Sequence, residues 1–306
     1  MTKHVYIIAS GGLGDVFQVY FSNPSCPEDT EKSERYPSSD PAQALWFRRL
    51  RNFKSQHPDV EVSIVLASHN PNTHELFEYD PYIDEVIQKP YSQKLDDDGY
   101  KVWESEKERE NNIQYRYDWR YYQPAPPEIY LGPGEFDIVE AIQKSGPFIV
   151  VHPGAGLRRR VVVTMTEYRK IIGQLLGIGY KVVVLGRAYQ KVVDGEVSEV
   201  VYEQYEDSRS GVLSLVNKVS ARVALELSMR CAGFIGSHSA LILAAWYAGV
   251  KSVCLVPPLH DSGIPFERFF RGDNPTTWGA DRSINKTVVI NGYNPDLAEQ
   301  VVEQFI

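Results

Sequence analysis

The sequence Gly236-Ser-His-Ser239 is a small polar turn between two apolar segments. The segment after it, residues 240–248, is apolar on every face, which predicts a buried helix. A turn of small residues that opens a helix leaves backbone N–H groups unpaired, and such groups bind anions. Ser237, His238 and Ser239 are therefore candidate ligands of a phosphate group, the alternative being an ordinary turn beside a core helix.

The residues around this turn are typical of a strand, turn, helix and strand in succession. An apolar strand is expected to end at Ile235, Gly249 suits the end of the helix, and residues 252–256 suit the next strand. In a parallel α/β sheet, ligands bind at the carboxyl ends of the strands, which is where this turn would lie. We therefore interpret the turn as the phosphate-facing floor of a nucleotide site.

Two further glycine-rich loops each follow an expected strand, one over residues 5–9 and the other over residues 148–151. Glycine lets a chain turn sharply and lets another group approach the backbone. Neither loop has the full spacing of a dinucleotide-binding fingerprint. The candidate residues are Gly11, Gly12, Gly14 and Asp15 in the first loop and His152, Gly154 and Gly156 in the second.

The alternation of expected strands and helices predicts an α/β fold. Further strands are expected over 60–66, 83–87, 180–185 and 287–290, and helices over 16–21, 42–53, 73–77, 166–176 (capped by Thr166), 212–219, 221–231 and 294–305. The rhythm restarts after Gly146-Pro147, so we expect two Rossmann-like domains, 1–145 and 146–306, facing a central cleft. Gly186, which closes the strand over 180–185, joins the candidate residues of the second domain.

Composition and charge limit the class of protein. The 306 residues are 43% apolar and 24% charged, as in a globular protein long enough for two domains. Residues 1–145 hold 15 Lys/Arg against 25 Asp/Glu, a balance of −10, whereas residues 146–306 hold 17 against 15, a balance of +2, and together they give the net charge of −8. An acidic first half argues against tight, non-specific binding of nucleic acid there, and the second half is the expected place for an anionic ligand.

Cysteine usage and hydropathy indicate a compartment. Cys26, Cys231 and Cys254 lie far apart and form neither a disulfide framework nor a zinc pattern, which favours the reducing cytoplasm. No signal peptide is expected, and no apolar run reaches the length of about 18 residues that a membrane span requires. Nothing in the residues indicates an oligomeric state.

Residues 88–135 interrupt the α/β rhythm. They hold a charge run over 104–110 and many Tyr and Trp side chains, and they lack clear periodicity. A long stretch of this kind within a compact protein is usually functional or an interaction surface. Its aromatic side chains suit stacking on sugar rings or bases, the alternative being that they pack an irregular subdomain.

Together the three loops resemble those of heptosyltransferase-type GT-B glycosyltransferases (family nine). Ser10-Gly-Gly-Leu-Gly-Asp-Val16 is similar to their N-terminal loop and Val150-Val-His-Pro-Gly-Ala-Gly156 to the opening of their second domain. Gly236-Ser-His-Ser-Ala-Leu-Ile-Leu-Ala-Ala245, followed by Gly249-Val-Lys-Ser-Val-Cys-Leu255, is similar to their donor-binding turn and helix. Order and spacing match along nearly the whole chain. The resemblance implies a GT-B fold, with a C-terminal helix that can return to the first domain.

The resemblance also implies an inverting, metal-independent transferase that uses a nucleotide sugar as co-substrate and needs no cofactor. Asp15 falls where the family keeps its proposed base, which would take the proton of an acceptor hydroxyl; its alternative role is to cap the following helix. Arg158, Arg159 and Arg160 fall near the family's basic residue at the leaving diphosphate. One of the three is expected to bind it, with Arg158 and Arg160 as candidates, and a solvated basic run is the alternative.

Two positions depart from the family pattern, which usually has Asp-Ser/Thr-Gly in the turn and a later His. Here the turn has His238-Ser239-Ala240, and Leu243 replaces the later His. The sugar, a hexose or a heptose, is therefore left open, as is the acceptor: a cell-surface glycan, a small molecule or a modified base in DNA. A non-catalytic protein that binds a nucleotide sugar is the other hypothesis. A dehydrogenase would need an acidic residue after the second strand, and residues 66–69 hold none.

Overall fold

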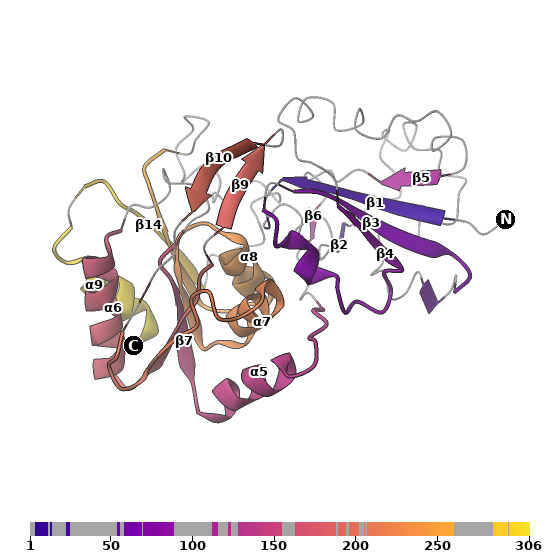
Figure 1. Cartoon of the computed structure of the whole chain (residues 1–306). Helices are drawn as coiled ribbons and strands as arrows, with labels where there is room; N and C mark the ends of the chain where they lie inside the picture. The colour runs from indigo at the N-terminus through magenta and orange to yellow at the C-terminus, as the bar shows by residue number, and fades with distance from the viewer. Residues whose placement is uncertain are drawn as a thin grey trace. The chain divides into compact units, whose positions relative to one another are not determined.

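The computed structural model of the chain describes residues 4–11, 13, 23–24, 54–55, 58–68, 70–88, 112–115, 122–123, 128–154, 163–187, 189–193, 196–201, 205, 207–259, 284–292 and 294–306 (Figure 1). It divides into two compact units. The first holds Met1–Ala125 with Val192–Glu196, and the second holds Pro126–Lys191 with Val197–Ile306. This division falls before the Gly146-Pro147 break at which the sequence analysis placed the boundary, because the helix over residues 135–144 packs within the second unit.

The first unit contains a parallel sheet of four strands in the order β4-β3-β1-β5. Their bounds are β1 His4–Gly11, β3 Glu61–Ser68, β4 Glu85–Gln88 and β5 Asn112–Tyr115. The short strands β2 (Asn23–Pro24) and β6 (Tyr122–Gln123) form an antiparallel pair, and the 3₁₀ helix η2 spans Thr73–Leu76. Val62 and Ile64 of β3 are fully buried, as expected for the centre of a parallel sheet.

The second unit contains a parallel sheet of six strands in the order β11-β8-β7-β12-β13-β14. Their bounds are β7 Phe148–His152, β8 Lys181–Val184, β11 Val212–Ser214, β12 Gly233–Gly236, β13 Ser252–Val256 and β14 Asn285–Val289. In chain order these are the first to sixth strands of the sheet, so the spatial order is 3-2-1-4-5-6, the doubly wound order of a Rossmann fold. A separate pair of strands, β9 (Tyr189–Val193) and β10 (Glu196–Val201), follows β8 along the chain.

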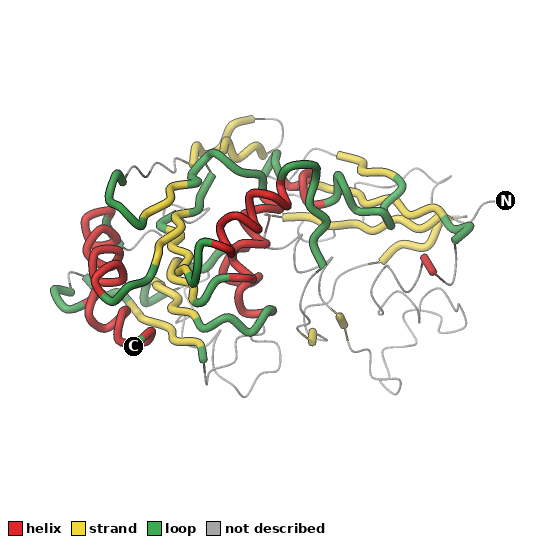
Figure 2. Tube along the Cα trace, turned by 90° about the horizontal axis from the view of Figure 1, so that it is seen from below, coloured by secondary structure: helices red, strands yellow, loops and turns green. Residues whose placement is uncertain are grey.

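Helices cover both faces of this sheet (Figure 2). Their bounds are α5 Glu135–Lys144, α6 Met165–Gly177, α7 Ala221–Arg230, α8 Ala240–Tyr247, α9 Leu297–Val302 and the 3₁₀ helix η8 Glu303–Phe305. Ile149 and Val151 of β7 pack with α6 and α9 on one face, and Val150 between them faces the other side. On that side α7 packs against α5 and α8. Every residue of α8 is buried, which confirms the prediction of a helix that is apolar all round.

Most of the expected elements are present within a residue or two of their predicted bounds, and four expectations are corrected. The C-terminal helix does not return to the first unit. Leu297, Val301 and Phe305 lie in the same core cluster as α6, because the apolar side of α9 and η8 matches the apolar side of α6 and the sheet edge beside it. The helix start is also displaced: Asp296 is the N-cap, and Asn294 accepts a hydrogen bond from its backbone N–H.

The segment 212–219 is not a helix. Val212–Ser214 is the edge strand β11, paired in register with β8. Asn217 has a φ of 59°, in the left-handed region that a right-handed helix cannot contain. A mostly apolar run this short does not distinguish strand from helix, and here the position beside β8 decided the structure.

The N-cap of helix α6 lies two residues before the predicted cap. Thr164, and not Thr166, is its N-cap: the Thr164 hydroxyl accepts from the N–H of Glu167, whose carboxylate accepts from the N–H of Thr164. This capping box satisfies donors at the helix start, and Thr166 has no such partner three residues on. The helices expected over 16–21 and 42–53, and most of the aromatic segment 88–135, lie outside the described residues.

Candidate functional site

The strand order of the second unit singles out one place at the carboxyl ends of its strands. Between β7 and β12 the strand order reverses, and in open α/β sheets ligands bind at this switch point, outside the carboxyl ends of the strands. His152 is the last residue of β7 and begins the connection to the loop after it, and Ser237 is the first residue after β12. The sequence-based candidates His152, Gly154 and Ser237–Ser239 therefore come together at the switch point.

Two hydrogen bonds join these loops. The Ser237 hydroxyl donates to the carbonyl oxygen of Gly154 at 2.7 Å, and the Ser239 hydroxyl lies 3.2 Å from Nδ1 of His152. His152, Gly154 and Ser237 are buried, and Ser239 is half-buried. The hydrogen bonds join the two loops into one polar surface, called the floor below, which their separation by more than eighty residues in the sequence did not reveal.

The close approach of the two strands depends on Gly236, the last residue of β12. Gly236 pairs in register with His152, and a Cβ atom on Gly236 would lie 2.8 Å from the carbonyl oxygen of His152 and 3.1 Å from its Cβ. Real Cβ atoms do not approach a backbone oxygen so closely, so β12 must end in glycine for the loops to meet. From the sequence alone Gly236 was expected in the turn, and its contact with His152 was not predicted.

Helix α8 starts directly from the floor. Ser239 is its N-cap in an extended conformation, and the Ser239 side chain makes no capping hydrogen bond within the helix but is directed to His152. The first N–H groups of an α-helix have no partner inside it and carry the positive end of the helix dipole. The floor therefore offers backbone donors suited to an anion at the point where the hydroxyls of Ser237 and Ser239 and the ring of His152 converge.

The structure also shows the surroundings of two more candidates, His238 and Gly186. The imidazole of His238 is buried, with its ring centroid 6.3 Å from that of Trp246 on α8. Gly186 follows β8, next to β7, and its carbonyl oxygen accepts a hydrogen bond at 2.9 Å from the N–H of Asn217. Gly186 thus joins the loops after β8 and β11, so its visible contact is with that neighbouring loop and not with the floor.

The remaining candidates are not placed beside the floor. Gly11 is the last residue of β1 in the first unit, opposite Ser68 of β3. Outside the described residues lie Gly12, Gly14, Asp15, Gly156, Arg158, Arg159 and Arg160. Their roles as base, acceptor loop and diphosphate ligands stay predictions.

A buried ion pair fixes the helices beside this sheet. Arg222, whose side chain is 5% exposed, donates from Nε and Nη2 to the two carboxylate oxygens of Glu135, both at 2.9 Å. Ser220 and the N–H of Gly132 donate to the same carboxylate. Partial burial by itself would raise the pKa of Glu135, but the hydrogen bonds from Arg222, Ser220 and Gly132 outweigh it and hold that pKa below its ordinary value. The first turn of α5 is thereby anchored to the first turn of α7.

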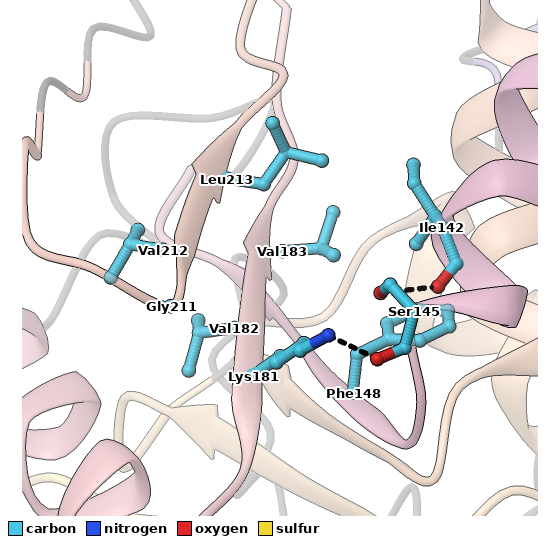
Figure 3. Close-up of a pocket in the computed structure, with 9 residues that line it drawn as sticks. All are labelled: Ile142, Ser145, Phe148, Lys181, Val182, Val183, Gly211, Val212 and Leu213. Atoms are coloured by element: carbon cyan, nitrogen blue, oxygen red, sulfur yellow. Dashed lines mark hydrogen bonds between the residues drawn. The ribbon is translucent and has the colours of Figure 1, made fainter.

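A small pocket lies at the opposite edge of the same sheet (Figure 3). Its volume is about 160 Å³, and its lining includes Phe148, Lys181 and Val212, the first residues of β7, β8 and β11. Figure 3 shows Ile142 and Ser145 of the α5 end facing these strands, with Lys181 Nζ donating to the carbonyl of Ser145. The pocket is mainly apolar and lies at the amino ends of the strands, so it is distinct from the floor.

In the described part of the chain, no group of three or more His, Cys, Asp or Glu side chains is arranged to hold a metal ion. None of the helices described is long and apolar enough to cross a bilayer.

Comparison with known proteins identifies the fold of the chain. No protein-family model and no curated protein matches the sequence. The structure is similar to ADP-heptose LPS heptosyltransferase II of E. coli, with 15% identity and a TM-score of 0.54 over 98% of this chain and 97% of that one. The chain has the GT-B fold.

Two other solved structures agree. A glycosyl transferase family 9 protein from Veillonella parvula has 11% identity and a TM-score of 0.50 over 98% of this chain and 91% of its own. E. coli heptosyltransferase WaaC with ADP has 9% identity and a TM-score of 0.50 over 99% of this chain and 100% of its own. The α/β fold class, and at the level of fold the resemblance to family nine, are confirmed.

Proposed function

We propose that this chain is a glycosyltransferase that moves a hexose or heptose from a nucleotide-sugar donor to an acceptor hydroxyl. The observation that carries the proposal is the floor at the β7/β12 switch point, where His152, Gly154, Ser237 and Ser239 are joined at the start of α8. Backbone donors and hydroxyls in this arrangement suit the diphosphate of a nucleotide sugar. Among the proteins of similar fold, WaaC is described with ADP.

The proposed reaction is a single displacement with inversion at the sugar carbon. The carboxylate of Asp15 takes the proton of the acceptor hydroxyl, the oxygen forms a bond to the anomeric carbon, and the bond from that carbon to the diphosphate breaks. The nucleoside diphosphate leaves with the electron pair, and one of Arg158, Arg159 and Arg160 offsets its charge. No metal and no cofactor take part in this scheme, so turnover is expected to be unchanged in EDTA.

We also propose that the reaction takes place in the cytoplasm. Neither Cys231 nor Cys254 forms a disulfide within the described part of the chain; both are buried, and burial raises the pKa of the Cys231 thiol to about 12. Buried thiols of this kind are typical of proteins in a reducing compartment and are chemically inert.

The test starts from binding. The full chain is titrated with ADP, UDP, GDP and CDP and with the matching nucleotide sugars; a ligand at a hundredfold excess over its Kd stabilises by about 2.7 kcal/mol, which a thermal shift detects. Turnover is then measured as release of the nucleoside diphosphate with glycan, small-molecule and modified-DNA acceptors. If none of these ligands binds, the proposal is overturned.

Asp15→Asn separates an enzyme from a protein that only binds the donor. The variant keeps the size of the side chain and loses the base, so we expect an unchanged Kd for the donor and a fall in turnover of about a hundredfold or more. Donor binding without turnover in the wild type, and with no effect of Asp15→Asn, would identify a non-catalytic nucleotide-sugar-binding protein instead.

A further inference from the structure

The turn from β12 into α8 is held from two sides. Ser237 and Ser239 bond to the loop after β7, whereas His238 contacts Trp246 near the far end of α8, with ring centroids 6.3 Å apart and ring planes at 40°. This separation is within the range of aromatic pairs. Helical side chains lean toward the helix N-terminus, so the indole of Trp246 reaches back along α8 toward the turn.

Hydrogen bonds fix the orientation of the indole. Trp246 Nε1 donates to the hydroxyl of Ser252 at 2.7 Å, and that hydroxyl donates to Oδ1 of Asn285 at 2.6 Å. An indole N–H only donates and a hydroxyl has one proton, so the direction of the chain is set. Ser252 and Asn285 are paired in register and begin β13 and β14. The hydrogen bond to Ser252 therefore holds the indole at the amino ends of β13 and β14. Its ring at the same time contacts His238, which follows the carboxyl end of β12.

This chain of polar groups is poorly explained by stability alone. Trp246 is 4% exposed and Ser252 is 1% exposed, and Nδ2 of Asn285 is buried without a hydrogen-bond partner among the described residues. An unsatisfied buried donor lowers stability, and an incompletely satisfied polar network is less stable than apolar packing. What the network does provide is a single orientation of the indole.

We propose that Trp246 is a positioning residue for the floor: locked by Ser252 and Asn285, its indole fixes His238 and so presets the Ser237–Ser239 turn that receives the diphosphate. The inference rests on the proposed function, which supplies the ligand. A turn held in its binding geometry before the ligand arrives saves the free energy of ordering it on binding. Loosening the indole should therefore weaken binding even where the fold is intact.

The test uses two variants of the full chain and one control. Trp246→Phe keeps an aromatic ring and removes the N–H, and Ser252→Ala removes the partner of that N–H. Ser228→Ala is the matched control, because Ser228 is a fully buried serine whose hydroxyl donates to the carbonyl of Ala224 at 2.8 Å within α7. Each variant is also made in a His238→Ala background.

Two readouts are taken below the melting temperature of every variant. In the chain labelled with isotopes in histidine, the ring signals of His238, assigned by their loss in His238→Ala, are expected to move in both test variants and not in Ser228→Ala. The Kd for ADP, with inorganic pyrophosphate as a probe that carries no base, is expected to rise roughly fivefold in both, the low end of couplings between touching residues. In the His238→Ala background the same substitutions should add nothing.

The outcomes separate the two proposals. Unmoved His238 signals, or a rise in Kd that persists without His238, would overturn the positioning role and leave the proposed function in place. If neither pyrophosphate nor any nucleoside diphosphate binds the wild type, the proposed function fails, and with it the role in donor binding; the His238 signals then still decide whether Trp246 orients that ring. A fall in melting temperature alone would show a purely structural role and overturn the inference.

Discussion

The strands of the six-stranded sheet have their carboxyl ends on one side of the sheet, called the carboxyl edge, and their amino ends on the other, called the amino edge. These two edges are closed in different ways. At the carboxyl edge, the turns are small and polar and are joined by hydrogen bonds between Ser237 and Gly154 and between Ser239 and His152. At the amino edge, the ring of Phe305 lies against Gly233, and apolar side chains line the small pocket. The difference indicates where a ligand can bind. Apolar side chains cover the amino edge, whereas the polar turns at the carboxyl edge leave hydrogen-bond donors for a ligand.

The largest effect should come from adding one methyl group at the carboxyl end of β12. In Gly236→Ala the new Cβ meets the backbone oxygen of His152, which cannot move without shifting β7. We expect a loss of stability of roughly 3 kcal/mol, with loss of ADP binding, measured by urea unfolding and calorimetry.

Gly233→Ala is the matched control at the amino edge. There the new Cβ meets the ring of Phe305 and Cδ1 of Ile149, so the atoms that must shift belong to side chains and not to the backbone of a strand. This variant should be destabilised less and should bind ADP with the wild-type Kd. Equal loss of binding in both variants would contradict the functional difference between the edges.

A smaller effect is expected at the two ends of α7. Glu135→Gln, near its first turn, leaves the buried guanidinium of Arg222 without its counter-charge and should cost about 2 kcal/mol near neutral pH. At the other end, Arg230 donates to Gln143 at the exposed surface, so Gln143→Ala should change stability by about 0.5 kcal/mol or less. Urea unfolding measures both, and a larger effect of Gln143→Ala would reverse the comparison.

The pH dependence of stability checks the same pair. The pKa of Glu135 is lowered in the folded chain from its ordinary value of 4.5, so its contribution is complete above that value and is lost as the pH falls through the folded-state pKa. The stability difference between the wild type and Glu135→Gln should therefore be constant near neutral pH and shrink below about pH 4.5. A difference that grows on acidification would mean that the carboxylate is not stabilised by Arg222.

The smallest effect compares two serine hydroxyls that each donate to a backbone carbonyl at 2.7 Å, Ser237 at the carboxyl edge and Ser145 at the amino edge. Ser237→Ala leaves a buried carbonyl unpaired and should cost about 1 kcal/mol and weaken ADP binding. Ser145→Ala lies at an exposed helix end beside the pocket and should change neither stability nor binding measurably. Weakened binding in Ser145→Ala would indicate that the amino-edge pocket takes part in the site.

Much of this protein was set by local pattern. Short apolar stretches were enough to predict the strands β7, β12 and β13. They also predicted the wholly buried helix α8 and its end at Gly249. The turn Ser237–Ser239 and the loop at His152 were also expected where they lie, each directly after an apolar strand, and their role in binding a ligand stays a prediction. The capping box of Thr164 and Glu167 was visible in the sequence as well and was missed.

Tertiary structure decided the rest. Whether residues 212–214 form a strand depended on β8 beside them, and where α9 packs depended on the free side of α6, so neither could be read from the local sequence. The hydrogen bond of Ser237 to Gly154, the contact that forbids a side chain at Gly236 and the reach of Trp246 to His238 each join residues from different elements. Local sequence fixes which conformation a segment prefers, whereas the packing of one element on another alone determines which side chains meet, because a contact is a property of two surfaces.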